Sequence, residues 1–344
     1  MIKEIHMNDS PYYQYGPYYN IPPYVLAQNS KRDLRKTSNM LCWTLLAAMF
    51  FMVAFTYICV AYLKAVGYTG DYSNSGFSGF TPVLFYLANG AGYLVGLSAP
   101  VLIYFSARHV ALSEALPFEK IGFLKTVACV FFGTAVCMLA NIPANAVVEI
   151  EKSFGFTGEL PNYPLTDDPA VLTLYFIIIA VIPPVVEELL FRGMILHSLR
   201  KYGDGFAVVG SAILFGLYHG NFVQMVFAFI AGLVMALVVV RTNSLWPSIL
   251  IHFFNNTISV AIEITQRYGG EQLANTVNNT VVGVFLVLGA AALVYLLVKD
   301  KRFFSGDPAN PFFRMSAKLG ALFFNPGGVA VLLFAAISSF RYLT

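Results

Sequence analysis

Three short groups of polar residues interrupt long apolar segments in the second half of the chain. Carboxylates and imidazoles are frequent general acids and bases, and amide N–H groups can stabilise an oxyanion, so such a set could activate water for hydrolysis. Inside a membrane segment, ionisable groups cost about 2.5–3.5 kcal/mol each on insertion scales, and they therefore indicate function. In chain order, the groups are Glu187, Glu188 and Arg192, then His219, then His252 and Asn256.

The first group places two carboxylates and one guanidinium on one predicted helix. Glu188 and Arg192 lie four residues apart, so they share a helix face and can pair. Glu187 points about 100° away, toward a different neighbour. One arginine neutralises only one carboxylate, so the other must be protonated, have a raised pKa or pair across helices. A carboxylate with a raised pKa in a dry site is what a general base requires. Pro183 and Pro184 precede the group and are expected to bend the helix and free backbone carbonyls.

The two histidine motifs admit other interpretations when each is taken alone. His219 could simply donate a hydrogen bond to a neighbouring carbonyl. His252 and Asn256 share a helix face at i, i+4, where they could link helices by hydrogen bonds. The functional alternative is a pair of donors aimed at one point, as an oxyanion hole requires.

The composition defines the setting of these groups. Of the 344 residues, 58% are apolar and 11% are charged, against roughly 25% charged residues in soluble domains. The mean hydropathy is +0.68. These values exclude a soluble globular enzyme and a disordered chain. Because the apolar segments are continuous rather than alternating, an all-α polytopic membrane protein is expected instead of a β-barrel.

About eight transmembrane helices are predicted, or nine if the last apolar segment also crosses. With the N-terminus in the cytoplasm, alternation puts sixteen Lys and Arg residues inside and four outside, which fixes the orientation. The segment 206–240 is expected to be a tight helical hairpin whose turn, at His219, lies below the membrane surface. The candidate spans are 41–64, 82–105, 123–148, 170–199, 206–221, 222–240, 246–266, 278–298 and 320–340.

The chain divides into a tail, a membrane domain and a C-terminal part. Residues 1–40 are a cytoplasmic tail rich in Pro and Tyr, expected to be disordered or polyproline-like over 11–24. Residues 41–300 form the membrane domain, and 301–344 form a linker with the additional hydrophobic segment. That segment is either a ninth span or a re-entrant piece. The four cysteines show no CxxC spacing, so neither a disulfide framework nor a cysteine zinc site is predicted.

The predicted depths test whether the polar groups could meet. At 1.5 Å per residue from the cytoplasmic ends of the spans, Glu187 and His219 lie about 20 Å deep. Arg192 lies about 12 Å deep, His252 about 9 Å and Asn256 about 15 Å. All five fall in one slab, in the cytoplasmic half of the membrane or near its midplane, so one shared site is predicted.

At these motifs the sequence resembles the CPBP family of CAAX proteases and bacteriocin-processing enzymes, also called the Abi family. The family pattern is EExxxR, FxxxH and HxxxN on successive membrane helices, which here is Glu187-Glu188…Arg192, Phe215…His219 and His252…Asn256. The segment 242–252 is also similar to the family's approach to its last motif. The resemblance covers about 170–260, which we take as the core of the membrane domain.

The resemblance implies an intramembrane glutamic endopeptidase, an EC 3.4 hydrolase. In that scheme Glu187 is the general base and His219 its partner on the water. His252 and Asn256 stabilise the oxyanion, whereas Glu188 and Arg192 orient the site and balance its charge. The family's eukaryotic branch removes the last three residues of prenylated CAAX proteins. The compact loops and the lack of a soluble domain favour a bacterial plasma membrane here, with a peptide or membrane-protein substrate near the cytoplasmic face.

Alternatives to this mechanism and function stay open at this stage. Zinc could be held by Glu187, His219 and His252, but HExxH is absent and a metal-free mechanism with no cofactor is favoured. A non-enzymatic immunity protein could bind a bacteriocin-like peptide in the same cavity. A proton-coupled transporter could use the set as a relay, although no internal repeat is visible. The expected partners are a peptide or membrane-protein substrate and the lipid bilayer, without nucleic acid.

Overall fold

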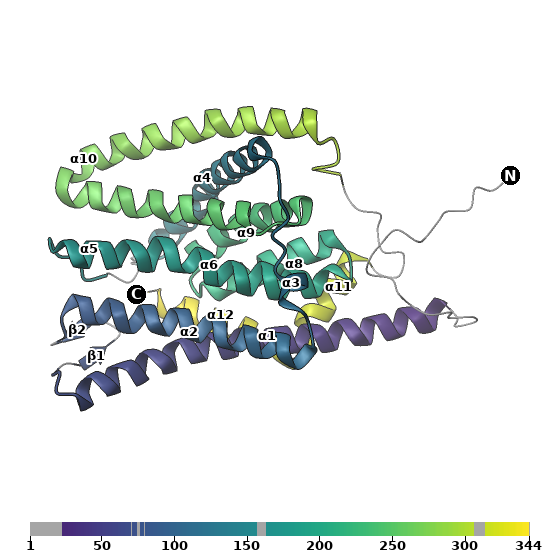
Figure 1. Cartoon of the computed structure of the whole chain (residues 1–344), viewed down its shortest axis with the longest axis horizontal. Helices are drawn as coiled ribbons and strands as arrows, with labels where there is room; N and C mark the ends of the chain where they lie inside the picture. The colour runs from purple at the N-terminus through teal and green to yellow at the C-terminus, as the bar shows by residue number, and fades with distance from the viewer. Residues whose placement is uncertain are drawn as a thin grey trace.

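The computed structural model describes residues 23–69, 71–73, 76–78, 80–156, 163–305 and 314–343, and they form a bundle of long helices with a two-stranded hairpin at one end (Figure 1). This confirms the all-α polytopic fold. The elements are α1 (Pro23–Ala65), β1 (Asp71–Ser73), β2 (Gly76–Ser78), α2 (Pro82–Arg108), α3 (Leu112–Ala115), α4 (Phe123–Ser153), α5 (Pro169–Phe176), η1 (Ile177–Val181), α6 (Ile182–Glu188), η2 (Leu189–Leu196), α7 (His197–Arg200), α8 (Asp204–Tyr218), α9 (Phe222–Thr242), α10 (Trp246–Lys299), α11 (Met315–Phe323) and α12 (Pro326–Arg341).

Six described helical segments are long and apolar enough to cross a membrane, and α11 with α12 adds a seventh if that pair, bent by 79°, counts as one span. One of the six, α10, has 54 residues, which would extend about 81 Å, far beyond a hydrocarbon core of about 30 Å. Gly270 has a non-helical backbone at φ 80° and ψ 169°, and Figure 1 shows α10 turning back on itself. Its two arms therefore match the predicted spans 246–266 and 278–298.

The short hairpin of α8 and α9 has the predicted form. With 15 residues, α8 extends about 22 Å, less than a full crossing. Its turn contains Gly220 at φ +64°, where a side chain would be strained and an added Cβ would lie 3.0 Å from Ser338 of α12. Phe222 also contacts Phe340, with ring centroids 5.8 Å apart. Helix α12 thus covers the turn, as irregular backbone at this depth requires.

Helix α1 extends beyond the predicted membrane span 41–64 on its N-terminal side, because it begins at Pro23. The early turns are helical because they pack on the bundle: Leu34 is fully buried, and Asp33 accepts hydrogen bonds from Lys201 at 2.8 Å and Tyr202 at 2.6 Å. Most of the Pro- and Tyr-rich stretch lies outside the described residues.

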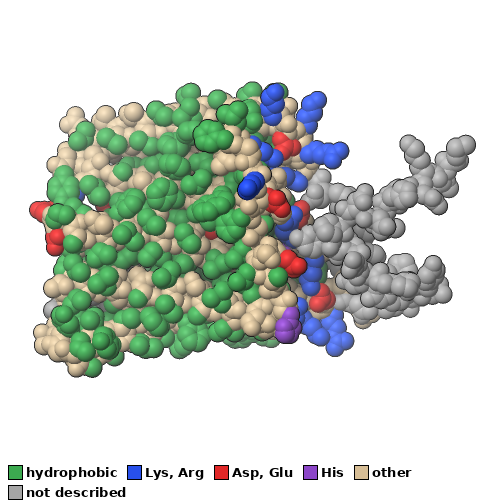
Figure 2. Space-filling model, in the orientation of Figure 1, with side chains coloured by type: hydrophobic (Ala, Val, Ile, Leu, Met, Phe, Trp, Pro, Cys, Tyr) green, Lys and Arg blue, Asp and Glu red, His purple; other side chains and the backbone are tan. Residues whose placement is uncertain are grey.

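The Lys and Arg side chains gather mainly at one end of the bundle. Figure 2 shows Lys and Arg side chains at the end where α1 begins, beside a largely hydrophobic flank. Ion pairs lie at the same end, including Lys125–Asp300 at 2.8 Å and Arg200–Asp204 at 2.9 Å. By the positive-inside rule this end is cytoplasmic. The protein is therefore an integral, multi-pass membrane protein, and the β1–β2 hairpin lies at its outer end.

Helices α1 and α2 approach each other closely at a glycine. A Cβ added to Gly96 would lie 2.2 Å from Cα of Met52, so backbone rather than a movable side chain blocks any substitution. Small residues commonly permit such contacts between membrane helices.

We predict that Gly96→Ala forces α1 and α2 apart and lowers the free energy of unfolding by about 1–3 kcal/mol. The measurement is thermal unfolding of the purified protein in detergent. Gly283→Ala is the matched control, because a Cβ there has no atom within 4 Å. Equal melting temperatures for the two variants would contradict the prediction.

Candidate active site

The two adjacent carboxylates lie in a helix that is not uniformly α-helical. Glu187 and Glu188 close the short α6, which stands between two π-helical stretches, η1 and η2. Such stretches are rare, and they occur often at functional sites because the wider turn redirects side chains. Both glutamates are buried at this point, with 3% and 0% of their surface exposed.

The Pro183–Pro184 pair explains one contact of Asn256. Neither proline has an N–H, so the carbonyl of Ile179 can accept neither an i+4 nor an i+5 hydrogen bond within its helix. Asn256 Nδ2, on α10, donates to this carbonyl at 2.9 Å. The freed carbonyl predicted from the prolines is therefore satisfied by a predicted site residue, and this bond ties α10 to η1.

Glu188 and Arg192 form the ion pair predicted from their spacing. Arg192 Nη1 lies 2.7 Å from Glu188 Oε1, and both side chains are fully buried. Arg192 also donates to the Gly232 carbonyl at 3.3 Å, and its guanidinium carbon lies 4.6 Å from the centroid of the Phe215 ring. Ser248 donates to the second oxygen of Glu188. These contacts hold the pair in one geometry, away from lipid and water.

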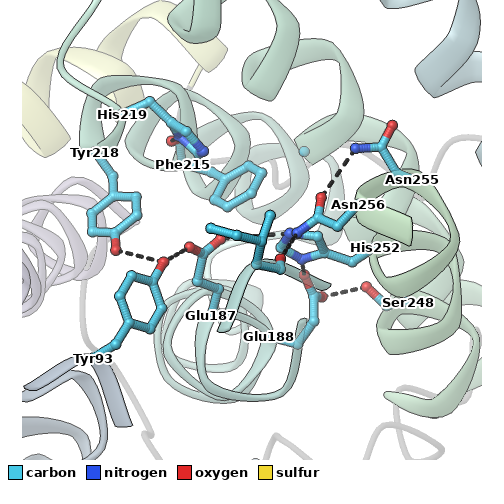
Figure 3. A network of polar contacts seen from close by, with 12 residues as sticks. Tyr93, Glu187, Glu188, Phe215, Tyr218, His219, Ser248, His252, Asn255 and Asn256 are labelled. Atoms are coloured by element: carbon cyan, nitrogen blue, oxygen red, sulfur yellow. Dashed lines mark hydrogen bonds and ion pairs between the residues drawn. The ribbon is translucent and has the colours of Figure 1, made fainter. Parts of the chain in front are cut away.

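Glu187 is hydrogen-bonded to Tyr93 on one side and faces His252 on the other (Figure 3). Tyr93 donates its hydroxyl hydrogen to Oε1, and Tyr218 donates to the Tyr93 oxygen at 3.1 Å. Among the described residues, Oε2 has no hydrogen-bond partner. Its nearest cationic candidate is His252, whose Nε2 lies 3.7 Å away. The tyrosines thus fix the orientation of the carboxylate and leave one oxygen for chemistry.

His252 lies between the two carboxylates. Its Nδ1 is 3.2 Å from Glu188 Oε1 and its Nε2 faces Glu187 Oε2. A carboxylate only accepts, so Nδ1 must carry a hydrogen here. An imidazolium at this position would supply the second positive charge that two carboxylates and one arginine lack. The sequence predicted the shortage of one cation, and the structure places a histidine where that cation is needed.

His219 lies at the end of α8 with its tautomer fixed. Nδ1 is 2.8 Å from the Phe215 carbonyl oxygen, which can only accept, so Nδ1 carries the hydrogen in the neutral ring and Nε2 keeps its lone pair. The Phe215 ring packs edge-on against both histidines, with centroids 4.9 Å from His219 and 5.9 Å from His252. The phenylalanine of the FxxxH motif therefore acts as a spacer that positions both imidazoles.

A cavity of about 700 Å³ connects these groups. It is lined by Glu187, His219, His252 and Asn256, whereas Glu188 and Arg192 do not line it. The six predicted residues thus come together as one site, with four at the cavity and two behind it. Their individual roles in catalysis stay predictions.

Two tyrosines and a serine in the site were not predicted. Tyr218 directly precedes His219 in the sequence, which was an available signal. Tyr93 stands in the predicted span 82–105 with no polar motif around it, and Ser248 has the appearance of an ordinary small helix residue. Only the packing of α2 and α10 against α6 brings Tyr93 and Ser248 to the carboxylates.

The zinc alternative finds no fit in this arrangement. Among the residues that the structure describes, no group of three His, Cys, Asp or Glu side chains is arranged to hold a metal ion. His252 contacts Glu188 through Nδ1, and His219 contacts a backbone carbonyl through Nδ1, so Nε2 is the ring nitrogen that each histidine would have left for a metal.

The fold and the site together define a polytopic membrane protein with a buried Glu–His centre. Residues 169–258 match the family described as Rce1-like, type II CAAX prenyl endopeptidase. This match confirms, over that segment, the CPBP resemblance drawn from the three motifs. Tyr93 and the other α1–α4 residues at the cavity lie outside the matched segment.

A curated protein of Bacillus subtilis (strain 168), named "Putative membrane peptidase YdiL", is similar to this chain. The two are 27% identical over 136 residues, which is 39% of this chain and 56% of the relative. The chain thus spans about half the length of the curated relative that it matches. No solved structure matches the chain. At the level of the family, these similarities support a CAAX-type intramembrane protease.

We predict that Arg192→Met lowers the free energy of unfolding by about 3–5 kcal/mol, because it leaves the buried Glu188 carboxylate without its cation. The double variant Glu188→Gln with Arg192→Met removes both charges and should recover much of this loss. Thermal unfolding in detergent measures both. A double variant no more stable than Arg192→Met would show that the unpaired charge is not the cause.

Proposed function

We propose that the protein is an intramembrane endopeptidase that hydrolyses a peptide bond with water activated by Glu187 and His219. The observation that carries the proposal is the state of Glu187: Oε1 is held by Tyr93, while Oε2 is buried at the cavity without a hydrogen-bond partner among the described residues. A buried carboxylate oxygen at a cavity, with its orientation fixed, suits a general base.

In the proposed reaction, Glu187 Oε2 takes a proton from water whose other hydrogen is accepted by His219 Nε2. The resulting hydroxide adds to the carbonyl carbon of the substrate peptide bond and forms a tetrahedral intermediate. Glu187 then gives its proton to the amide nitrogen, the C–N bond breaks, and a carboxylic acid and an amine leave. The tautomer that the Phe215 carbonyl imposes on His219 supports this role, because it keeps Nε2 available as an acceptor.

The negative oxygen of the intermediate needs preorganised donors. An imidazolium at His252, balanced by Glu188 through Nδ1, would offer its Nε2–H to this oxygen. Asn256 uses Nδ2 to reach the Ile179 carbonyl, and its second amide hydrogen is free to donate. Glu188 and Arg192 keep the net charge of the site near zero. The substrate in this proposal is a membrane-associated protein or a small peptide.

A non-enzymatic immunity protein that binds a bacteriocin-like peptide is the second candidate, because the same cavity could hold a peptide without cleaving it. Protection of cells against such a peptide that survives Glu187→Gln would favour binding over hydrolysis.

We predict that Glu187→Gln abolishes cleavage without changing the amount of protein in the membrane, because an amide cannot take the proton from water. New protein N-termini in membranes that express each form can be counted by mass spectrometry, without knowledge of the substrate. Glu263→Gln is the matched control: Glu263 pairs with Tyr175, outside the cavity lining. Full cleavage by the Glu187 variant would refute the proposal.

We further predict that Tyr93→Phe lowers kcat about 10- to 100-fold with little change in KM, since a hydrogen bond to a charged group contributes about 1.5–3 kcal/mol. Steady-state kinetics on a peptide substrate of the wild type make the comparison. Tyr86→Phe on the same helix is the control, because the Tyr86 hydroxyl bonds the Pro164 carbonyl. Equal kcat values for the two variants would show that the Tyr93 hydroxyl does not contribute to catalysis.

A further inference from the structure

Most residues that line the cavity at Glu187 lie in the outer half of the bundle, while Met235 of α9 and His252 of α10 line it nearer the cytoplasmic end. Helix α1 runs from the cytoplasmic end outward, and its cavity residues, such as Met52 and Tyr57, lie in its second half. Helix α4 runs the same way, and Asn141 and Asn145 line the cavity from its second half. Helix α2 begins at the outer end, and Asn89 lines the cavity from its first turns. The cavity therefore extends from His252 toward the outer face.

The cytoplasmic side of the site is closed. On the helix that carries Glu187, no residue beyond it toward the cytoplasm lines the cavity, and the buried Glu188–Arg192 pair fills that space. The segment 109–122, which contains α3 and is called the α3 segment here, lies at the cytoplasmic end of the bundle. Its Pro117 carbonyl accepts a hydrogen bond from Leu245 N at 2.8 Å, and Glu119 N donates to the Asn243 carbonyl at 3.3 Å. These bonds link the α3 segment to the turn between α9 and α10.

The turn of the α8–α9 hairpin lies beside the outer part of the cavity. Helix α8, with 15 residues, is shorter than a full crossing, whereas α9 has 21. Residues at the start of α9, including Gln224 and Phe227, form part of the cavity lining. Tyr163, from the outer segment before α5, also reaches the cavity lining.

The two walls of this cavity differ in chemistry. One wall presents amides from α4 and α10, among them Asn141, Asn145 and Asn255. Asn141 and Asn255 use Nδ2 in bonds within the protein, so their amide oxygens are the acceptors that they offer to a peptide N–H. The other wall presents Met49 and Met52 from α1, and thioether side chains adapt to varied apolar groups. Amides opposite methionines suit a peptide with small and apolar side chains.

We propose that the cavity is an outward-facing entry route, and that the substrate is an extended peptide segment that reaches Glu187 from the outer side of the membrane. The claim that this peptide segment is a substrate rests on the proposed peptidase function, whereas the direction of access does not. This direction differs from the cytoplasmic-face expectation of the sequence analysis, which used depth alone and could not locate the cavity.

Cysteine labelling tests the direction of access without an activity assay. The four native cysteines are replaced by alanine, and Asn145→Cys or Ser259→Cys is introduced at the cavity. Ile142→Cys is the matched control on α4, since Ile142 is 67% exposed on the flank and does not line the cavity. Lys120→Cys reports the cytoplasmic end. A membrane-impermeant maleimide is added to right-side-out and to inside-out vesicles.

Both cavity cysteines should react at least tenfold faster than the Ile142 variant in right-side-out vesicles, where the Lys120 variant should stay unlabelled. Faster labelling of the cavity cysteines in inside-out vesicles, or rates equal to the Ile142 variant, would overturn the outward route.

A second measurement separates access from catalysis. A fluorogenic octapeptide of small and apolar residues is added to either type of vesicle, with the Glu187→Gln form as the blank. Cleavage confined to right-side-out vesicles supports both proposals. Cleavage confined to inside-out vesicles overturns the outward route and leaves the peptidase function intact. Outward labelling without cleavage in either type supports the route and counts against this peptide class as substrate.

Discussion

Two carboxylates on one helical turn inside a membrane need two positive partners, and much of the bundle follows from this constraint. The low dielectric makes an unpaired charge expensive and a well-paired one strong. Arg192 supplies one partner from the same helix at i+4. The other candidate, His252, comes from α10, so α10 must pack against α6 at one register. Ser248 and Phe215 complete the surroundings of the Glu188–Arg192 pair: Ser248 donates to Glu188, and the Phe215 ring packs against the Arg192 guanidinium.

Backbone chemistry imposes the same register independently. The Pro183–Pro184 pair deprives the Ile179 carbonyl of helical partners, and Asn256 satisfies it from α10. His252 and Asn256 are one helical turn apart, so one face of α10 meets both the orphan carbonyl and the carboxylates. A shift of α10 by one residue would leave a polar group unsatisfied in the membrane interior, which costs several kcal/mol. The two constraints therefore reinforce each other.

The sequence predicted the polytopic helical fold, the hairpin with its buried turn, and the meeting of the three motifs. These features depend on apolar length, charge placement and helical spacing, all of which are local. The sequence did not predict Tyr93, because its partner lies 94 positions away and nothing near it differs from an ordinary membrane helix. The start of α1 was also missed, since Asp33 is stabilised by Lys201 and Tyr202, which are equally remote. Tertiary contacts of this kind have no signature in a single sequence.

The cover over the α8–α9 turn has a consequence for biogenesis. Ser338 and Phe340, which shield that turn, belong to the last described helix and leave the ribosome more than a hundred residues after His219. Until α12 inserts, the turn exposes backbone polar groups at membrane depth. The loop and the imidazole next to it can settle only once α12 has docked. Formation of the Glu–His site thus waits for the synthesis and insertion of α12.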